Sequence, residues 1–503
     1  MRWRLSALML VLVAALGAAG PAAAQRSGDL VFALSGSPDT FDPHKTAATL
    51  AFQVMRSVYD TLVEPDDKGV LVPALAESWA VSPDGLTWTF TLRRGVKFHH
   101  GKELGAEDVK ATFERIAAPT TRSPKRTDFV AIARVEAVDP LTARFVLREK
   151  FAPFLAALGQ GWGAILPKDM IDRNHDFHGR PIGTGPFRLA EWVKDSHVRL
   201  VRFPDYFVKG QPRVTGVTFR IIPERTVKVS GLLTGEFDVV DAVDPLDLPR
   251  LQNNAQVKVQ RVLTSTVNVV SMNHARRPLS DARARRALYH AIDREAIIKA
   301  VYGGYARRTG VFMEPQSPYY VDVGDPYPYN PERAKQLLNE AGLPQGFTVD
   351  LALPQPYEAH IRTGQLVQAM LGRAGVQARI RVVEWGIWLS RIYQGRDFDL
   401  TVIGHTGKLD PDGRLADFGD PDRPRNYVNY SNPKVASLID AGRFTADPRL
   451  RQRIYAEALR KMTEDAMMVF IGVPEVFMGM RSNVRNVQMT YAIDTFDLRV
   501  AVK

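Results

Sequence analysis

The segment between residues 347 and 403 constrains the fold most, because two kinds of hydrophobic periodicity alternate along it. Residues 376–382 alternate apolar and polar side chains, and 347–353 and 398–403 are short apolar-rich runs, so all three are predicted strands. Residues 358–374 and 385–394 between them have helical spacing of apolar side chains. A strand-helix-strand-helix-strand order is typical of parallel βαβ units. The pattern therefore predicts an α/β domain.

Two loops of this segment are candidates for a ligand site. Ligands of parallel sheets bind beyond the carboxyl ends of the strands. Those ends are followed by residues 354–357, Pro-Gln-Pro-Tyr, and residues 404–408, Gly-His-Thr-Gly-Lys. We expect these two loops, distant in sequence, to meet at one place.

The rest of the chain divides into a strand-rich part and a helix-rich part. The first third is strand-rich, with predicted strands at 86–92, 143–147 and 198–203 and a helix at 106–116. From Ser280 onward helices dominate. Ser280 is the predicted N-cap of one long helix that ends at the glycine pair 303–304.

The N-terminus has the pattern of a secretory signal peptide. Arg2 and Arg4 precede an apolar run, and Ala22–Ala24 supply the small residues for cleavage after Ala24. The apolar run is shorter than a membrane-spanning helix needs, and the chain has no cysteine for disulfides or lipid attachment. We therefore predict an exported protein of a Gram-negative periplasm, with residues 1–24 removed.

Composition narrows the classes of function. The 503 residues, 45% of them hydrophobic, are enough for two to four domains. The net charge is +11, and loss of Arg2 and Arg4 with the leader would leave +9. The basic residues are scattered and not interleaved with aromatics, so we expect no nucleic-acid binding. We expect a monomer.

The stretch VKFHHGKE, residues 96–103, raises the question of a metal site. Adjacent residues of a strand point to opposite faces, so His99 and His100 are poorly placed to hold one ion. We interpret the stretch as a structural turn and predict no metal and no cofactor. The glycines of Gly183-Thr184-Gly185-Pro186 are interpreted as a tight turn with positive φ, with an anion-binding nest as the alternative.

The chain has no common catalytic signature. GxSxG, HExxH and a Walker loop do not occur, and Gly159-Gln160-Gly161-Trp162-Gly163 lacks the spacing of a dinucleotide loop. We expect no catalytic residues and no enzymatic activity. An exported hydrolase stays the alternative from another class.

Several long motifs together resemble the family 5 solute-binding proteins of ABC importers, the group of dipeptide, oligopeptide and nickel binders. The motifs run along nearly the whole mature chain: LVPALAESWAVSPDGLTWTFTLRRGVKFHHGKELGAEDVKATFER, IGTGPFRLAEW followed by FPDYF, MNHARRPLSDARARRALYHAIDREAI, NPERAKQLLNEAG and NYSNPKVASLID.

The resemblance implies a two-lobed periplasmic-binding-protein fold, type II-like and of cluster C, with an extra β-rich subdomain in lobe I. Lobe I would comprise residues 25–270, with the subdomain at about 54–168. Lobe II would comprise 271–473, and 474–503 would return to lobe I. Hinge strands would cross near 267–272 and 470–473.

The resemblance also implies the function, which is capture of a peptide or peptide-like solute by lobe closure and delivery to an ABC permease. A ligand-responsive sensor with the same fold is the alternative. The predicted ligand-binding residues lie in the two converging loops and the helix beside them: Gln355, Tyr357, Trp385, His405, Lys408 and Asp410.

Two departures from the family concern the ligand. Dipeptide binders carry an arginine that binds the peptide carboxylate, and this chain has Gln355 at that position. They also carry an aspartate that binds the peptide ammonium. The matching loop of this chain is one residue shorter and reads Lys408-Leu409 there. Asp410 is the candidate replacement. A lysine beside a buried ammonium repels it. We therefore predict that free dipeptides bind poorly and leave longer peptides, modified peptides, opines and glycosides open.

Overall fold

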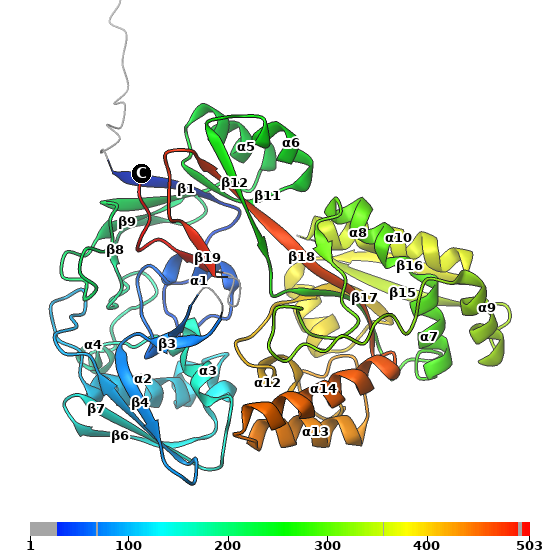
Figure 1. Cartoon of the computed structure of the whole chain (residues 1–503), viewed down its shortest axis with the longest axis horizontal. Helices are drawn as coiled ribbons and strands as arrows, with labels where there is room; N and C mark the ends of the chain where they lie inside the picture. Colours follow the sequence, from blue (N-terminus) through cyan, green and yellow to red (C-terminus); the bar gives the residue numbers. More distant parts are fainter. Residues whose placement is uncertain (1–27, 67–68, 356, 491–494) are drawn as a thin grey trace, which may run out of the picture.

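The computed structural model describes residues 28–66, 69–355, 357–490 and 495–503, and these form two lobes around a shared sheet (Figure 1). The predicted signal peptide lies outside the described residues. Within them, no helix is long and apolar enough to cross a bilayer.

A twelve-stranded mixed sheet runs through both lobes. Its main path has the order β16-β15-β17-β13-β18-β11-β1-β10-β9-β8, and β12 and β14 pair with β18 outside this path. The strands are β1 Asp29–Leu34, β8 Phe187–Val193, β9 His197–Arg202, β10 Gly216–Ile221, β11 Val239–Val243, β12 Val257–Leu263, β13 Val267–Met272, β14 Ala306–Arg307, β15 Phe347–Pro354, β16 Val376–Val383, β17 Leu400–His405 and β18 Met468–Arg481.

The long strand β18 links the two halves of this sheet. Its first part, Met468 to Gly472, pairs with β13 on the side of β17. Its last part pairs with β11 and β12. Three hydrophobic cores include residues of it: one is built from residues between 267 and 473, one from residues 30–239 and 478–501, and a smaller one from residues 33–257 and Phe477. We call the part around the first core lobe II and the part around the other two lobe I; the exact boundaries stay predictions.

Lobe II contains the predicted parallel unit. β15 pairs in parallel with β16 and with β17, which confirms the strand-helix-strand pattern. The intervening helices are α10 Glu358–Arg373 and the short α11 Trp385–Ile387, which continues as the π-helix η5 Trp388–Gln394. The other helices of lobe II are α7 Ala282–Ala291, α8 Arg294–Tyr302, α9 Pro331–Glu340, α12 Asp412–Leu415, α13 Pro433–Phe444 and α14 Pro448–Glu464.

The single helix predicted after Ser280 is wrong in two respects. The N-cap is Asp281, whose carboxylate accepts a hydrogen bond from the Arg283 amide. The helix also ends at Ala291, and Asp293 caps a second helix by accepting from the Ala296 amide. Side-chain capping at an internal aspartate stabilises a new helix start, and apolar periodicity alone does not reveal it.

Lobe I carries the β-rich subdomain. A four-stranded antiparallel sheet has the order β4-β5-β7-β6 and packs against α2 and α3. The strands are β4 Ala76–Val81, β5 Thr87–Leu92, β6 Ile132–Asp139 and β7 Thr142–Leu147. The remaining elements of lobe I are β2 Val63–Pro65, β3 Leu71–Pro73, β19 Gln488–Thr490, β20 Thr495–Asp497, α1 Thr49–Met55, α2 Ala106–Ala117, α3 Phe154–Leu158, α4 Lys168–Asp172, α5 Arg225–Thr234 and α6 Leu248–Gln252.

The lobes touch, so the structure is a closed form. The Ala152 amide of lobe I donates to the Arg443 carbonyl of lobe II at 2.9 Å. Arg425 of lobe II lies 4.0 Å from Asp128 of lobe I. In Figure 1 the helices α13 and α14 accordingly lie below the sheet and next to α3 of lobe I.

Candidate functional site

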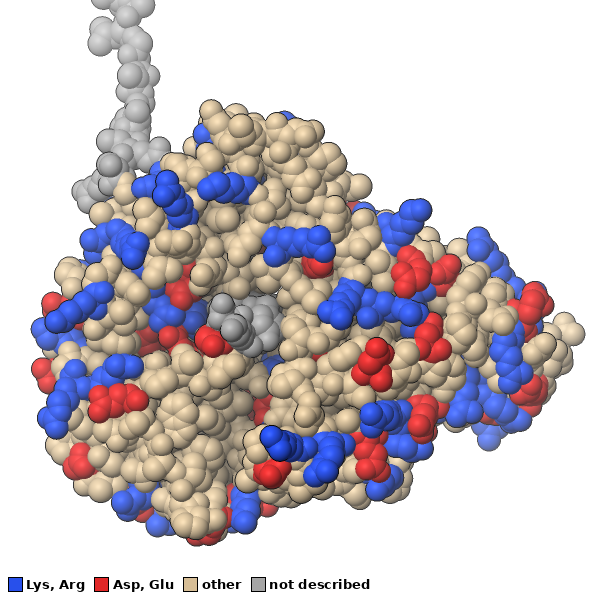
Figure 2. Space-filling view, viewed as in Figure 1, with Lys and Arg blue, Asp and Glu red and all other residues tan. Residues whose placement is uncertain are grey.

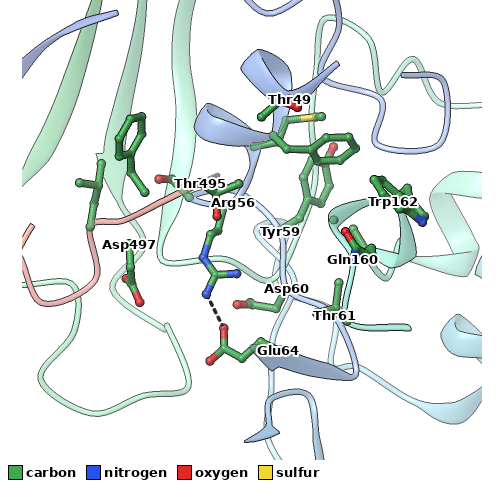
Figure 3. A pocket seen from close by; sticks show the side chains of 18 of the residues that line it. Thr49, Arg56, Tyr59, Asp60, Thr61, Glu64, Gln160, Trp162, Thr495 and Asp497 are labelled. Carbon is green, nitrogen blue, oxygen red and sulfur yellow. Dashed lines mark hydrogen bonds and ion pairs between the residues drawn. The ribbon is translucent and has the colours of Figure 1, made fainter. Parts of the chain in front are cut away.

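A pocket lies where the two lobes meet, and segments from both lobes line it. Figure 3 shows lining residues that lobe I contributes. It encloses about 930 Å³ of space between protein atoms, part of it open to solvent. Lobe I contributes residues between Ala47 and Glu64, between Gly159 and Ala164, and between Thr495 and Arg499, while lobe II contributes Thr406, Gly407 and Lys408.

The segment after α1 forms the charged wall of lobe I. Arg56 pairs with Glu64 at 3.0 Å (Figure 3). Glu64 also accepts from Arg499 at 2.8 Å. Arg499 in turn pairs with Asp497. These two cations and two carboxylates therefore balance one another within the wall.

Asp60 is the buried carboxylate of this wall. Thr184 donates to one oxygen at 2.8 Å and Tyr206 to the other at 3.4 Å. Burial raises the pKa of Asp60 to about 6, and the nearby charge of Glu64 acts in the same direction. Its two hydroxyl donors hold Asp60 in place between α1 and the Gly183–Pro186 loop.

The Gly183–Pro186 loop needs its glycines for close approach. Neither Gly183 nor Gly185 has positive φ, so the predicted reason was wrong. A Cβ at either position would lie closer than 3.0 Å to the backbone of Val58. The Gly185 amide donates to the Val58 carbonyl at 3.0 Å, which brings Thr184 against Asp60.

The first of the two histidines of VKFHHGKE holds the same loop from the other side. The His99 ring contacts the Gly185 carbonyl through Nε2 at 2.9 Å and the Gly183 amide through Nδ1 at 3.3 Å. His100 instead lies 3.2 Å from Asp169. The described residues contain no cluster of three or more histidine, aspartate or glutamate side chains arranged to hold a metal.

The aromatic wall of the pocket consists of Phe52 and Trp162. Their rings meet edge to face, with centroids 5.8 Å apart. Gly161 permits this contact, because a Cβ there would overlap the Phe52 ring. Two lysine ammonium groups approach the Trp162 ring, Lys125 at 4.1 Å and Lys408 at 4.9 Å from its centroid.

Lys408 is the predicted site residue that lines the pocket. It reaches from lobe II to Trp162 of lobe I. Burial between the lobes, together with the positive charge of Lys125, lowers the pKa of Lys408 to about 7. The contact with an indole face stabilises a cation less than an ion pair with an anionic partner would.

The structure places Asp410 away from the pocket lining. It is buried, and its two oxygens accept from Arg451 at 2.6 and 2.7 Å. Arg451 lies on α14, 41 residues further along the chain. Asp410 is thereby neutralised inside lobe II.

His405 lies at the end of β17, with its imidazole 2.7 Å from the Tyr427 hydroxyl and packed on Phe312. Burial lowers its pKa to about 3, and Arg414 nearby acts in the same direction. His405 is therefore neutral at physiological pH and packs inside lobe II.

The remaining predicted residues gather at the carboxyl ends of β15 and β16. Tyr357 is 41% exposed and meets Trp385 edge to face at 5.1 Å, and Trp385 stacks on buried Trp388. Gln355 is exposed, with its backbone amide bonded to the Val383 carbonyl. These three side chains form a surface of lobe II outside the pocket lining, and their role in binding stays a prediction.

Sequence reasoning missed the lobe I half of the pocket. The Gly159–Gly163 stretch was considered only as a dinucleotide loop, although Trp162 within it forms the aromatic wall. Three distant segments of lobe I converge only in the tertiary structure. Unlike the parallel unit of lobe II, they contain no periodic pattern that predicts their meeting.

The fold and the pocket together define a two-lobed protein that encloses a small solute. Residues 70–425 match the family described as bacterial extracellular solute-binding proteins, family 5. The dipeptide-binding protein of Escherichia coli K12 is 33% identical, over 97% of this chain and 96% of the relative. The glutathione-binding protein GsiB of Salmonella choleraesuis is 31% identical, over 89% and 90%.

Solved structures agree with this assignment. The periplasmic binding protein DppA of Helicobacter pylori, associated with an ABC transporter and solved with the peptide STSA, superimposes with a TM-score of 0.83. It shares 28% identity and covers 93% of this chain and 98% of its own. The chain belongs to the family 5 extracellular solute-binding proteins, the binding components of ABC importers.

Proposed function

We propose that this protein captures a peptide or peptide-like solute between its lobes in the periplasm and delivers it to an ABC permease of the inner membrane. The observation that carries the proposal is the pocket lined by both lobes, with Asp60 and Trp162 on one side and Lys408 on the other. Because this lining is complete only when the lobes meet, a solute that fills it stabilises the closed form.

The relatives support a peptide-like solute. They are a dipeptide-binding protein, a glutathione-binding protein and a protein solved with the tetrapeptide STSA. All three ligands carry peptide bonds, whose carbonyl and amide groups need polar partners in the pocket. Polar lining residues such as Thr61, Gln160 and Thr406 are available for such contacts.

Free dipeptides fit this pocket poorly. Asp410, the carboxylate that would anchor an ammonium, is already paired with Arg451. Lys408 faces the pocket and repels a second cation. A free N-terminal ammonium near Lys408 would therefore bear an electrostatic cost without a counter-charge.

The protein itself carries out no chemistry in this proposal. Asp60, the pocket carboxylate with a raised pKa, has both oxygens held by Thr184 and Tyr206. It therefore acts as a structural acceptor inside the wall. A monomer of this kind supplies recognition, and the ATPase of the transporter supplies the energy for uptake.

Isothermal titration calorimetry with a ligand panel tests the proposal. The panel contains a free dipeptide such as Ala-Phe, the tetrapeptide Ser-Thr-Ser-Ala, glutathione, an opine and a glycoside. We expect binding of a peptide-like member other than the free dipeptide, and its loss in Trp162→Ala. Tight binding of the dipeptide, or binding of the glycoside alone, would contradict the proposed ligand class.

A further inference from the structure

Lys408 differs from the other cations of the pocket lining in having no anionic partner. Arg56 and Arg499 both pair with Glu64. Within the described part of the chain, the ammonium group of Lys408 makes no hydrogen bond or ion pair, and its contact is with the ring of Trp162. The pocket therefore presents one cation whose charge the protein leaves unbalanced.

The carboxylates on the lobe II side of Lys408 are already engaged. Asp410 pairs with Arg451, and Asp412 pairs with Arg443 at 3.0 Å. The sequence neighbours of Lys408 therefore supply no free counter-charge.

Both lobes add positive charge at this corner of the pocket, Lys125 from lobe I and Arg414 and Arg425 from lobe II. Lys125, Arg414 and Arg425 all lower the pKa of Lys408, and Asp128 is the carboxylate that opposes them. Asp128 also lies 4.0 Å from Arg425, and Arg425 forms a second ion pair with Asp417. Lys125 and Lys408 approach the same Trp162 ring, so two ammonium groups share one aromatic side chain.

A partly buried cation without a counter-charge is unfavourable, and an anion placed against it removes much of that cost. We propose that the captured solute carries an acidic group, a carboxylate, which lies against Lys408 at the corner formed with Trp162 and Lys125. This inference rests on the proposed function and adds the charge of the ligand at one defined position. It makes the site complementary to an acidic solute.

Inorganic sulfate tests the anion site without knowledge of the natural solute. Wild type, Lys408→Gln and Lys194→Gln are unfolded thermally in sodium sulfate balanced with sodium chloride to constant ionic strength. Lys194 is an exposed lysine of lobe I, so this control makes the same change in net charge. We expect a saturable rise in Tm of a few degrees in wild type and in the control, and its loss in Lys408→Gln. Equal responses in all three proteins would overturn the proposal.

A pair of peptides then tests the carboxylate. The N-succinyl and N-succinamoyl forms of Ser-Thr-Ser-Ala with an amidated C-terminus have the same shape, and the succinyl carboxylate of the first is the only carboxylate in the pair. In wild type we expect the acid to bind at least tenfold more tightly than the amide, and in Lys408→Gln the two to bind alike. The same ratio in both proteins would contradict an acidic ligand group at Lys408. A sulfate effect at Lys408 without binding of either peptide would retain the anion site and refute the peptide-like class.

Discussion

At the scale of single residues, Lys408 links recognition to closure. In the closed structure burial lowers its pKa to about 7, from an ordinary value of 10.5. Lys125, Arg414 and Arg425 add repulsion, and Asp128 partly offsets it. In an open form the ammonium is hydrated and this cost disappears. An unbalanced Lys408 thus opposes closure until a solute supplies an anion.

The pH dependence of the free protein follows from this shift. Between about pH 7 and 10.5 the open form binds a proton that the closed form lacks, so raising pH through that window favours closure. We expect small-angle scattering of ligand-free wild type to show compaction between pH 6 and pH 9. Lys408→Met, which lacks the charge, should be equally compact at both values. A pH response that persists in Lys408→Met would assign it to other groups.

Asp410 is predicted to stabilise the fold. Without Asp410, Arg451 would stay buried with no carboxylate and no water to balance its charge. Asp410→Ala should therefore lower the free energy of unfolding by about 3–5 kcal/mol. The matched control is Glu332→Ala, which removes an exposed pair with Lys335 and should cost at most about 0.5 kcal/mol. Urea unfolding measures both changes. Unchanged stability in Asp410→Ala would contradict a structural role of this carboxylate and favour a role in ligand binding.

The sequence alone did not show that Lys408 lines the pocket and that Asp410 does not. Both follow β17 in the sequence, and both were predicted to line the cleft. The difference comes from Arg451, which reaches Asp410 from a helix 41 residues away. Such long-range pairing depends on tertiary packing, and a single sequence does not reveal it.

At the scale of elements, the Gly183–Pro186 loop determines where Asp60 lies. An added methyl at Gly185 would overlap the Val58 backbone, so Gly185→Ala should lower the free energy of unfolding by about 1–3 kcal/mol. The control is Gly372→Ala in α10, where a Cβ meets nothing within 4 Å. Helix propensity predicts that this change stabilises by about 0.5–1 kcal/mol. Chemical denaturation of the two variants should show opposite signs; equal signs would refute the close-approach account.

The elements themselves differ in how well the sequence predicts them. The strand-helix-strand-helix-strand segment of lobe II was predicted to within two residues at each boundary, because β15, β16 and β17 alternate with helices of clear periodicity. The break between α7 and α8 was missed, because it depends on the cap at Asp293. The lobe I wall was missed for another reason, since α1, the Trp162 segment and the C-terminal segment meet only after folding.

At the scale of the whole molecule, β18 runs through both lobes, and the pocket lies where the lobes meet. Lys and Arg side chains are interspersed with Asp and Glu on the face seen in Figure 2, and the surface is hollowed where the lobes meet. That the protein binds no nucleic acid stays a prediction from the sequence. The positive charge that the proposed ligand recognition uses is the local one at Lys408.

Export is a separate prediction at this scale. The signal peptide is expected to be cleaved after Ala24, so that the mature chain begins at Gln25. Intact-mass spectrometry of protein isolated from the cell envelope measures the N-terminus directly. A mass that includes residues 1–24 would show that the leader is retained as an anchor.

Closure over a solute is the central claim, and small-angle scattering of stripped and reloaded protein tests it most directly. Protein purified without denaturation is unfolded, freed of small molecules by dialysis and refolded, and the released low-molecular-weight fraction is then added back. We predict a smaller radius of gyration after reloading, because contacts on Trp162 and Lys408 coexist only when the lobes meet. An identical radius before and after saturation with the released fraction would contradict capture by lobe closure.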